Sequence, residues 1–518
     1  MKGRRAVGSA VSGRLVIVAL TMAAWLIAGA VSTSAIPSSC SAPASAKAVH
    51  VSTASHPQSR ACARSQPFCL DADGDGYGVG SANGPDADDA DEGVNTPETL
   101  LAKYGSLPAF LGARGLDVRR VFYIARGGND RKGLHDDESR PFATWLRVYS
   151  LLRPGDIVVF RQGTYQGNPV IDCTQPRWRD AKAPVIVMAY PGEKVVLSSS
   201  GHCISIGYSS NLVFDGFVLD NPDPEGYGVG LWMNDSSKIT IRNVESMHHT
   251  WGLFGMQDLH NILIENNVVH DNLQEHGIYL GSRDLPNSDI TVRGTLMYHN
   301  GRHGFQHNGR VTNLVVENNV IHSNVMGGIA LLEGVSNSFI RGNLIFNNDT
   351  QGITFYNYDD PSPNTAIFAY DQNNNVIENN IIWVGRDSWE PNGQSPADFS
   401  AIEFTDDTAA QAHSMSGNVI RNNTLVTYNG PTFKFSSSRF AAANTITDNT
   451  ICRYSGPGQV LQVAGTTYGL SGFGSYSGLF SGNVFGLPRF TDVSLDYYAR
   501  PDRFDFSLCG HAVPGVSR

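Results

Sequence analysis

The sequence predicts an all-β solenoid, and two repeated features carry that prediction. One is a phrase of an apolar residue, Glu or Arg, and a closing Asn, which recurs at Ile264–Asn267, Val316–Asn319, Ile340–Asn343, Ile377–Asn380 and Ile420–Asn423. The other is a glycine followed by alternating apolar residues, at Gly252, Gly277, Gly304, Gly328 and Gly352. The resulting period of about 24 to 27 residues is typical of solenoids. Each unit is too short to bury an apolar face alone, so stacked coils must supply the core.

Composition agrees with a folded β-rich chain. The 518 residues are 41% hydrophobic and 17% charged, with 54 glycines. A solenoid adds core with every coil, so one domain can extend over several hundred residues. The formal net charge of -10 argues against nucleic acid as a partner. We expect a monomer.

The first 35 residues have the features of a secretory signal. Arg4, Arg5 and Arg14 precede or flank an apolar run from Leu15 to Val31, and small residues follow up to Ala35. An uncleaved membrane anchor is the alternative. Residues 36–66 are rich in Ser, Ala and Pro, as linkers are. We therefore expect a secreted protein, extracellular or periplasmic, with no stable membrane insertion once the signal is removed.

Export permits disulfides among the seven cysteines. Proximity in sequence suggests three pairs and leaves Cys40 over, although the connectivity stays open. The suggested pairs are Cys62 with Cys69, Cys173 with Cys203, and Cys452 with Cys509.

Residues 67–100 form an Asp-rich segment that suits a hard cation. Carboxylates alternate at Asp71, Asp73 and Asp75, and Gly76 occupies the sixth position, as in calcium loops of the EF-hand type. The twelfth position is Ala82 instead of the bidentate Glu. The segment resembles the calcium repeats of thrombospondin type 3 and dockerin modules, in which later aspartates complete the ligand set. This resemblance implies a structural Ca²⁺ bound by Asp71, Asp73, Asp75, Asp86, Asp88, Asp89 and Asp91.

The chain from Val121 to Ile451 resembles the right-handed parallel β-helix proteins of the pectate-lyase-like superfamily. The resemblance rests on Phe122–Ala125, on Gly163-Thr164-Tyr165, on Ala183–Gly192 and on the Asn-rich coils. It implies a right-handed parallel β-helix over residues 119–510, with a short helix within Trp145–Leu152 capping the first coil. It also implies an extracellular polysaccharide as partner. The superfamily contains lyases, hydrolases, epimerases and adhesins, so the fold alone leaves the reaction open.

Alignment on the glycines predicts which side chains meet on the outer surface. If the first and third residues after each glycine face the core, an outward column forms from Phe254, Tyr279, Gln306, Ala330 and Thr354. Neighbouring members would lie about 4.8 Å apart. His276 and His303 precede two of the glycines and should be spatial neighbours. The coil of His276 has one extra residue, and such a bulge would present Glu275 or His276 outward.

Histidines and arginines crowd the same two coils. No Asp or Glu follows Asp289 until Glu317, whereas Arg293, Arg302, Arg310, His299, His303 and His307 all fall between. This predicts a local positive patch beside His276, Tyr279 and Arg283. The alternative is structural: histidines at β-helix turns are often ladder residues, His307 aligns with buried leucines, and His270 and His322 align with Phe346.

A positive patch with histidine and tyrosine suits β-elimination from a uronate. Arginine binds the carboxylate, one group removes the C5 proton, and another protonates the leaving oxygen. We therefore expect a polysaccharide lyase with His276 or His303 as base, Tyr279 as acid, and Arg283, Arg302 or Arg310 on the carboxylate. C5 epimerisation shares the first step and is not separated from elimination by sequence. Gln306, Trp251, Phe254, Glu333 and Tyr356 are the expected substrate-binding residues.

Two other classes remain open. A glycoside hydrolase would need two carboxyl groups flanking the bond. The candidates are Glu275, Asp284, Glu333, Asp359 and Asp360. A non-catalytic carbohydrate-binding protein or adhesin would use the aromatic residues alone.

Overall fold

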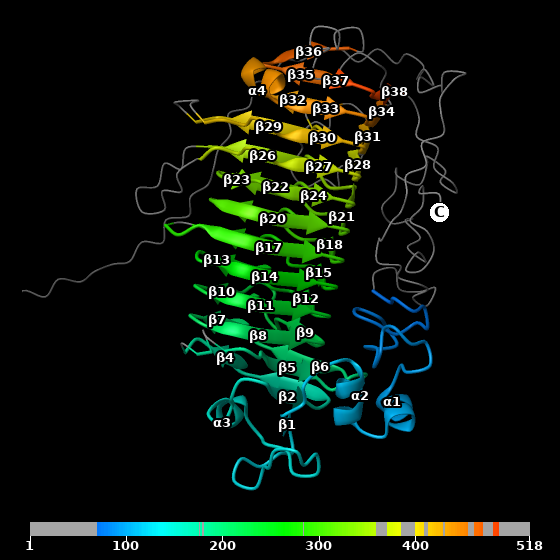
Figure 1. The fold of residues 1–518 in the computed structure, drawn as a ribbon, viewed down its shortest axis with the longest axis vertical. Coiled ribbons are helices and arrows are strands. Elements are labelled where there is room, and N and C mark those ends of the chain that lie inside the picture. Colours follow the sequence, from blue (N-terminus) through cyan, green and yellow to red (C-terminus); the bar gives the residue numbers. More distant parts are fainter. Residues whose placement is uncertain are drawn as a thin grey trace, which may run out of the picture. The chain divides into compact units, whose positions relative to one another are not determined.

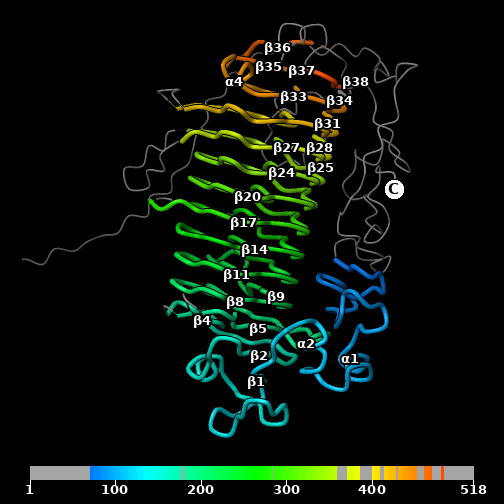
Figure 2. The backbone as a smooth tube through the Cα atoms, in the orientation of Figure 1, coloured from blue at the N-terminus to red at the C-terminus, as the bar shows by residue number. Residues whose placement is uncertain are grey.

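The strands build three parallel sheets that wind together as a right-handed parallel β-helix, as the repeats predicted. The structure is a computed structural model, and Figure 1 shows its strands stacked in chain order. It describes residues 70–175, 177–178, 181–282, 284–358, 370–384, 399–408, 413–427, 430–453, 460–469 and 480–485. Most coils contribute one strand to each sheet, and the tube in Figure 2 follows this path from coil to coil.

The first sheet carries the Glu and Arg of the repeated phrase on its outer face. Arg293 pairs with Glu265, Arg341 with Glu317 and Arg421 with Glu378, each across neighbouring strands. Its strands are β1 (Arg120–Ile124), β2 (Asp156–Phe160), β5 (Val185–Ala189), β8 (Ser210–Asp215), β11 (Ser237–Arg242), β14 (His260–Glu265), β17 (Asn287–Arg293), β20 (Val311–Glu317), β23 (Val335–Ser336), β24 (Phe339–Arg341), β27 (Val376–Glu378), β30 (Val419–Arg421), β33 (Thr445–Thr447) and β37 (Phe480–Ser481).

The second sheet has mostly short strands, and the middle residue of its three-residue strands faces the core. These strands are β3 (Gly163–Gln166), β6 (Val195–Ser198), β9 (Phe217–Asp220), β12 (Glu245–Met247), β15 (Val268–His270), β18 (Leu296–Tyr298), β21 (Val320–His322), β25 (Leu344–Phe346), β28 (Ile381–Val384), β31 (Thr424–Thr427), β34 (Thr450–Arg453) and β38 (Val484–Phe485).

The third sheet carries the glycine-led segments. It consists of β4 (Ile171–Cys173), β7 (His202–Gly207), β10 (Val229–Asn234), β13 (Trp251–Met256), β16 (Ile278–Gly281), β19 (Phe305–Asn308), β22 (Ile329–Leu332), β26 (Ile353–Asn357), β29 (Ile402–Asp406), β32 (Phe433–Phe435), β35 (Leu461–Val463) and β36 (Thr466–Tyr468). Only the last pair, β35 with β36, is antiparallel.

The repeated asparagines form amide ladders at the turns. In one ladder, the Nδ2 of Asn319, Asn343, Asn380 and Asn423 each donates to the Oδ1 of the next asparagine at 2.9–3.0 Å. The partners are 24 to 43 residues apart in sequence. The residue before each ladder asparagine has a positive φ, for example 55° at Asn318 and 63° at Gly342, a conformation that Asn and Gly tolerate best. The need for a positive φ at the first position and for a ladder amide at the second explains the Asn-Asn and Gly-Asn pairs in the repeat.

The core is one continuous cluster that runs inside the coils from Phe122 to Phe480. The helix α3 (Trp145–Tyr149) closes its first end, because Trp145, Val148 and Tyr149 belong to that cluster. The Nε1 of Trp145 donates to the carbonyl of Asp172 at 2.9 Å. The predicted capping helix is therefore confirmed. A further helix, α4 (Ser438–Ala443), packs Phe440 and Ala441 into the same cluster near the other end.

Two helices that the repeat did not predict cover the outer face of the first coils. α1 (Pro97–Tyr104) and α2 (Leu107–Ala113) pack Leu100, Phe110 and Leu111 against a separate apolar cluster that includes Ile157 and Tyr190. Thr96 caps α1 and Ser106 caps α2, each followed by a proline in the first turn. Leu70 and Val79 pack against later coils, at Val268, Leu296 and Tyr298 of the second sheet.

One expected disulfide is not formed. Cys173 and Cys203 are both buried and free. Cys173 lies opposite Ile206, and Ile171 lies opposite Ile204, so the two thiols sit at different positions along neighbouring strands. They serve as small apolar core residues. The pairs Cys62 with Cys69 and Cys452 with Cys509 fall wholly or partly outside the described residues. Among the helices of the described ranges, none has the length and apolar character needed to cross a membrane.

Candidate functional site

The outer face of the third sheet carries the predicted column. Phe254 pairs with Tyr279, Tyr279 with Gln306, Gln306 with Ala330, and Ala330 with Thr354. The residues on either side of each member, such as Ile278 and Leu280, are buried in the core. The register predicted from the glycines is thus the register of the structure. The column continues to Glu403 on β29.

His276 and His303 lie next to each other at the edge where the chain enters this sheet. Their rings stack with centroids 5.3 Å apart and planes 6° apart. The Nδ1 of His276 accepts a hydrogen bond from the backbone N–H of His303 at 3.2 Å. Its Nε2 lies 3.4 Å from the Oε2 of Glu275. Both nitrogens of His276 are therefore engaged, with the proton assigned to Nε2.

The two histidines differ in the hydrogen-bond partners of their ring nitrogens. His303 makes a hydrogen bond with the side chain of Gln306, and its Nδ1 has no hydrogen-bond partner among the described residues. Burial lowers the pKa of His303 to about 3, and the charge of Arg302 acts in the same direction. Burial also holds the pKa of His276 well below its ordinary value. Both imidazoles are neutral at neutral pH, with exposed fractions of 2% for His276 and 8% for His303.

Glu275 and Arg302 form an ion pair in front of the histidines. The Nε of Arg302 lies 3.1 Å from the Oε2 of Glu275, and the Arg302 side chain is 51% exposed. Burial raises the pKa of Glu275, which the charge of Arg302 partly offsets. The extra residue in this coil thus presents Glu275 rather than His276 to the surface. One carboxylate therefore contacts both a buried imidazole and an exposed guanidinium.

The predicted positive patch is dispersed in the structure. The short strand β19 separates Arg302, at its start, from Arg310, beyond its end. Arg310 instead donates to the carbonyl of Asp284 and stacks over Tyr370 at 4.8 Å. His307 is buried in the solenoid, 3.1 Å from the Nδ2 of Asn287. The grouping of Arg310 with the two histidines was therefore wrong, because sequence proximity does not tell which edge of a sheet a residue occupies. Arg283 lies outside the described residues.

Aromatic side chains line the outer face on the N-terminal side of this group. Phe254 and Tyr279 stack with centroids 5.3 Å apart and planes 7° apart, and Trp251 lies 5.2 Å from Phe254. Tyr279 in turn lies 5.4 Å from His276. Tyr227, which is 61% exposed, lies 5.7 Å from Trp251 and was not singled out from sequence. Trp232 pairs with Phe254 and so precedes it in the column. Its presence in the sequence was the available signal that the aromatic surface extends toward Tyr227.

The other predicted binding residues are placed further along the sheet. Glu333 is fully buried just after β22, in a left-handed conformation with φ of 61°. Tyr356 donates its hydroxyl to Asp407 at 3.0 Å. Asp359 and Asp360, which were candidates for a hydrolase together with Glu333, lie outside the described residues. Sequence reasoning missed Glu403, which is buried in the column and accepts hydrogen bonds from Gln351 and Thr405 and an ion pair from Lys434.

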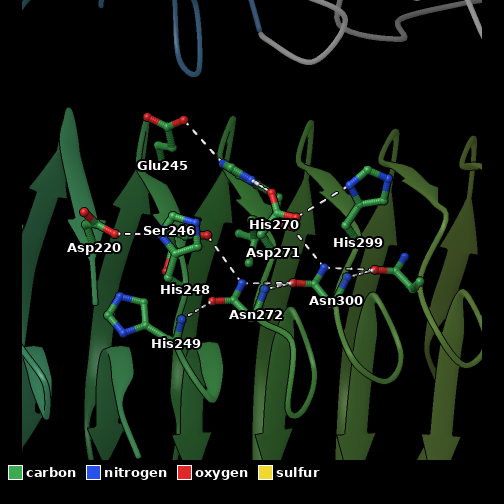
Figure 3. A network of polar contacts seen from close by, with 12 residues as sticks. Asp220, Glu245, Ser246, His248, His249, His270, Asp271, Asn272, His299 and Asn300 are labelled. Carbon is green, nitrogen blue, oxygen red and sulfur yellow. Dashed lines mark hydrogen bonds and ion pairs between the residues drawn. The ribbon is translucent and has the colours of Figure 1, made fainter. Parts of the chain in front are cut away.

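A second polar network occupies the turn between the second and third sheets (Figure 3). His270 lies between two carboxylates, 2.6 Å from Asp271 and 3.3 Å from Glu245. Burial alone would lower the pKa of His270, but the two carboxylates raise it to about 9. Its ring also stacks on Tyr298, which stacks on His322. We infer that this network stabilises the coil stack, as the alignment of His270 and His322 with Phe346 suggested.

The Asp-rich segment folds into a loop with converging carboxylates. Two groups, Asp71 with Asp73 and Asp89, and Asp73 with Asp75 and Asp86, hold oxygens within 4.8 Å of one another. The Oδ2 atoms of Asp73, Asp75 and Asp86 are buried without a hydrogen-bond partner. Burial, reinforced by neighbouring carboxylates, raises the pKa of Asp86 to about 8. Such a donor set fits a hard cation. Asp88 and Asp91 instead pair with Arg114 and Lys103.

Comparison with known proteins agrees with the fold. Residues 193–345 match the family model described as right handed beta helix region. The uncharacterized protein YwoF of Bacillus subtilis (strain 168) is 28% identical over 133 residues, which are 24% of this chain and 21% of YwoF. The chain thus spans about a fifth of the length of that relative.

Solved structures also align with this chain, at low sequence identity. The GH136 lacto-N-biosidase from Eubacterium ramulus aligns with a TM-score of 0.50 and 11% identity, covering 75% of this chain and 71% of that one. The A-module of the mannuronan C-5 epimerase AlgE4 of Azotobacter vinelandii aligns with a TM-score of 0.43 and 17% identity, covering 64% and 86%. The resemblance to parallel β-helix proteins is confirmed, while the resemblance of the Asp-rich loop to calcium modules stays a prediction.

Proposed function

We propose that this protein is a carbohydrate-active enzyme that removes the C5 proton of a uronate in a polysaccharide, with β-elimination as the outcome. The observation that carries the proposal is the group formed by Glu275, His276, Tyr279, Arg302 and His303. It places an exposed guanidinium, two neutral imidazoles and a phenol beside a run of partly exposed aromatic rings.

Arg302 is the group that suits the uronate carboxylate. Its guanidinium forms a planar fork with several donors, so it can exchange part of its contact with Glu275 for a bound carboxylate. Neutralising that carboxylate makes the neighbouring C5–H more acidic. Glu275 also holds His276 on its other side, so the three residues form a fixed frame for the sugar.

His303 is the better candidate for the base, and His276 for a positioning residue. A base needs a free nitrogen lone pair. The Nδ1 of His303 makes no hydrogen bond but is buried in the unliganded protein, so the proposed proton transfer requires the substrate to displace the side chains that cover it, whereas both nitrogens of His276 are engaged. In the proposed step, His303 accepts the C5 proton, the C5–H electrons form the C4=C5 double bond, and the C4–O bond breaks. Tyr279 gives its proton to the leaving oxygen. Delivery of a proton to the opposite face of C5 would instead give epimerisation.

The alternative of a hydrolase fits this group less well. A pair of acids must lie roughly 5 to 9.5 Å apart across the bond. Glu403 belongs to the same wall, but the column places it four strands beyond Tyr279, about 19 Å at 4.8 Å per strand. Glu275 and Glu403 therefore do not form such a pair.

The test is an absorbance assay for unsaturated uronate on separate acidic polysaccharides. We expect a rise with the wild-type protein and a loss of at least 100-fold with His303→Asn and Tyr279→Phe, while His322→Asn serves as a control for a buried histidine elsewhere. Proton exchange at C5 without a rise in absorbance would indicate the epimerase. New reducing ends without either signal would overturn the proposal in favour of a hydrolase.

We also propose that the Asp-rich loop binds Ca²⁺ through Asp71, Asp73, Asp75, Asp86 and Asp89. The buried, unpartnered carboxylate oxygens support this, because their mutual repulsion calls for a cation. The role is structural, since the loop adjoins Ala87 and Val94, which pack in the apolar cluster under α1 and α2. We expect the protein to be secreted and its partner to be an extracellular polysaccharide.

A further inference from the structure

Six aromatic side chains form a continuous surface on the third sheet, here called the aromatic platform. Five of them are partly exposed, and Tyr227 is 61% exposed on its loop. Ring contacts of 5.2 to 6.4 Å connect them from the coil of β7 to the coil of β16. The platform consists of His202, Tyr227, Trp232, Trp251, Phe254 and Tyr279.

The loop that carries Tyr227 is held in place by the neighbouring coils. The side-chain amide of Gln274, two coils further on, donates to the carbonyl of Glu225 at 3.0 Å. Thr250 accepts a hydrogen bond from the N–H of Gly228 at 3.1 Å. A large exposed ring on a fixed loop loses little entropy when a ligand covers it, so the platform is preorganised for binding.

The charge of this surface excludes one class of ligand. Strands β7, β10, β13 and β16 contain no Lys or Arg, and neither do the segments 199–201, 221–228, 248–250 and 271–277 that lead into them. The same segments carry Asp223, Glu225, Asp271 and Glu275. Asp271 pairs with His270, and Glu275 pairs with Arg302. Among the residues that the structure describes, the first cation along the column is Arg302, at the coil of β19. A chain of uronates lying here would place its carboxylates near Asp223 and Glu225, with no cation in these strands and segments.

We propose that the aromatic platform binds a run of neutral sugars, and that the substrate is therefore a heteropolysaccharide in which neutral residues adjoin the uronate held by Arg302. Pyranose rings present C–H faces that pack on aromatic rings without needing charge. One coil step of about 4.8 Å is close to the length of one sugar. The glycan then lies along the solenoid axis with about one sugar per coil. This inference rests on the proposed function for the position of the uronate.

The experiment is calorimetric titration of the whole protein with defined hexasaccharides. The neutral probes are β-1,4-linked galactose, mannose and xylose hexamers, and the charged probes are hexagalacturonate and hexamannuronate. We expect one or more neutral hexamers to bind, and Tyr227→Ala and Trp232→Ala to weaken that binding at least tenfold. Phe339→Ala is the matched control, since Phe339 is an exposed aromatic on the first sheet.

The outcomes separate the two proposals. Binding of uronate hexamers alone, or no binding by any neutral hexamer, would overturn the platform proposal even if unsaturated uronate were released from another polymer. Neutral binding that Tyr227→Ala and Trp232→Ala leave unchanged would overturn it as well. Platform-dependent neutral binding supports it, and if no acidic polysaccharide were cleaved, the lyase proposal alone would fail.

Discussion

Arg302 and Arg310 are eight positions apart in sequence yet serve different edges of the third sheet. Arg302 faces Glu275 and the stacked histidines, whereas Arg310 lies over Tyr370. A hydrogen-bonded charge pair is worth about 1.5–3 kcal/mol, or roughly tenfold to 100-fold in rate. We expect Arg302→Gln to lower kcat/KM on the cleaved uronate polymer about 100-fold and Arg302→Lys to lower it by less. Steady-state kinetics with Arg310→Gln as the control checks this, and equal losses in the two glutamine variants would contradict it.

His270 gives a pH-dependent contribution to stability. Its pKa of about 9 in the folded protein exceeds the ordinary value of 6.5, because Asp271 and Glu245 favour its charged form. The stabilisation is therefore complete below about pH 6.5 and is lost as the pH rises through 9. Its size is on the order of 1–3 kcal/mol.

The matched substitution for this effect is His270→Phe, since Phe346 occupies the same column two coils beyond Tyr298. We expect the Tm of the wild type to fall further between pH 6 and pH 10 than the Tm of His270→Phe. Thermal melts at several pH values measure the difference. Nearby titratable groups are Glu245, Asp271 and His299, which both proteins retain. Parallel curves for the two proteins would refute the assigned charge.

At the scale of the element, close contact between coils requires glycine at the start of the third-sheet strands from β10 to β26. A Cβ on Gly328 would lie 2.4 Å from the Cγ2 of Ile345 and 2.9 Å from the carbonyl of Gly352. We expect Gly328→Ala to destabilise the protein by about 1–3 kcal/mol. Gly112→Ala, where a Cβ on α2 meets nothing within 4 Å, should be neutral or stabilising. Chemical denaturation compares them, and a neutral Gly328→Ala would show that the coils can separate.

The elements were largely predictable because their signals are local. Each ladder asparagine and each glycine repeats at the position where the coil needs it, so the register of Phe254, Tyr279 and Gln306 followed from alignment alone. Tyr227 and Glu403 were missed because each follows a segment of irregular length. The pairing of Ile402 with Ile353 places Ala401 where the other coils have their glycine, so the glycine alignment could not reach Glu403. The separation of Arg302 from Arg310 depends on where β19 ends, which the repeat does not specify.

At the scale of the whole molecule, the Asp-rich loop connects the first coils to the middle of the solenoid. Ala87 packs in the cluster with Ile157, while Leu70 and Val79 pack against Val268 and Leu296 several coils later. A cation that orders this loop should therefore stabilise contacts at both places. The effect is about 2.7 kcal/mol at a Ca²⁺ concentration 100 times Kd.

We expect Ca²⁺ to raise the Tm of the full chain and EDTA to reverse the rise. Asp73→Asn combined with Asp75→Asn should abolish the response, because both residues contribute buried oxygens. Asp117→Asn is the control, since that carboxylate is 85% exposed and outside the loop. Calorimetric scans with and without Ca²⁺ make the comparison. If Ca²⁺ left the Tm of the wild type unchanged, the proposed metal site would be disproved.

The amide ladders have a consequence for how such a protein can change. Asn343 and Asn380 are 37 residues apart, and Asn380 and Asn423 are 43 apart, yet these rungs keep the same 2.9–3.0 Å contact as rungs separated by 24. The spacing between coils is thus set by the ladder contacts and does not depend on the length of chain between them. Segments can be lengthened, exchanged or transplanted between rungs while the frame stays intact. A lineage could therefore acquire a new sugar specificity by insertion, without redesigning its core.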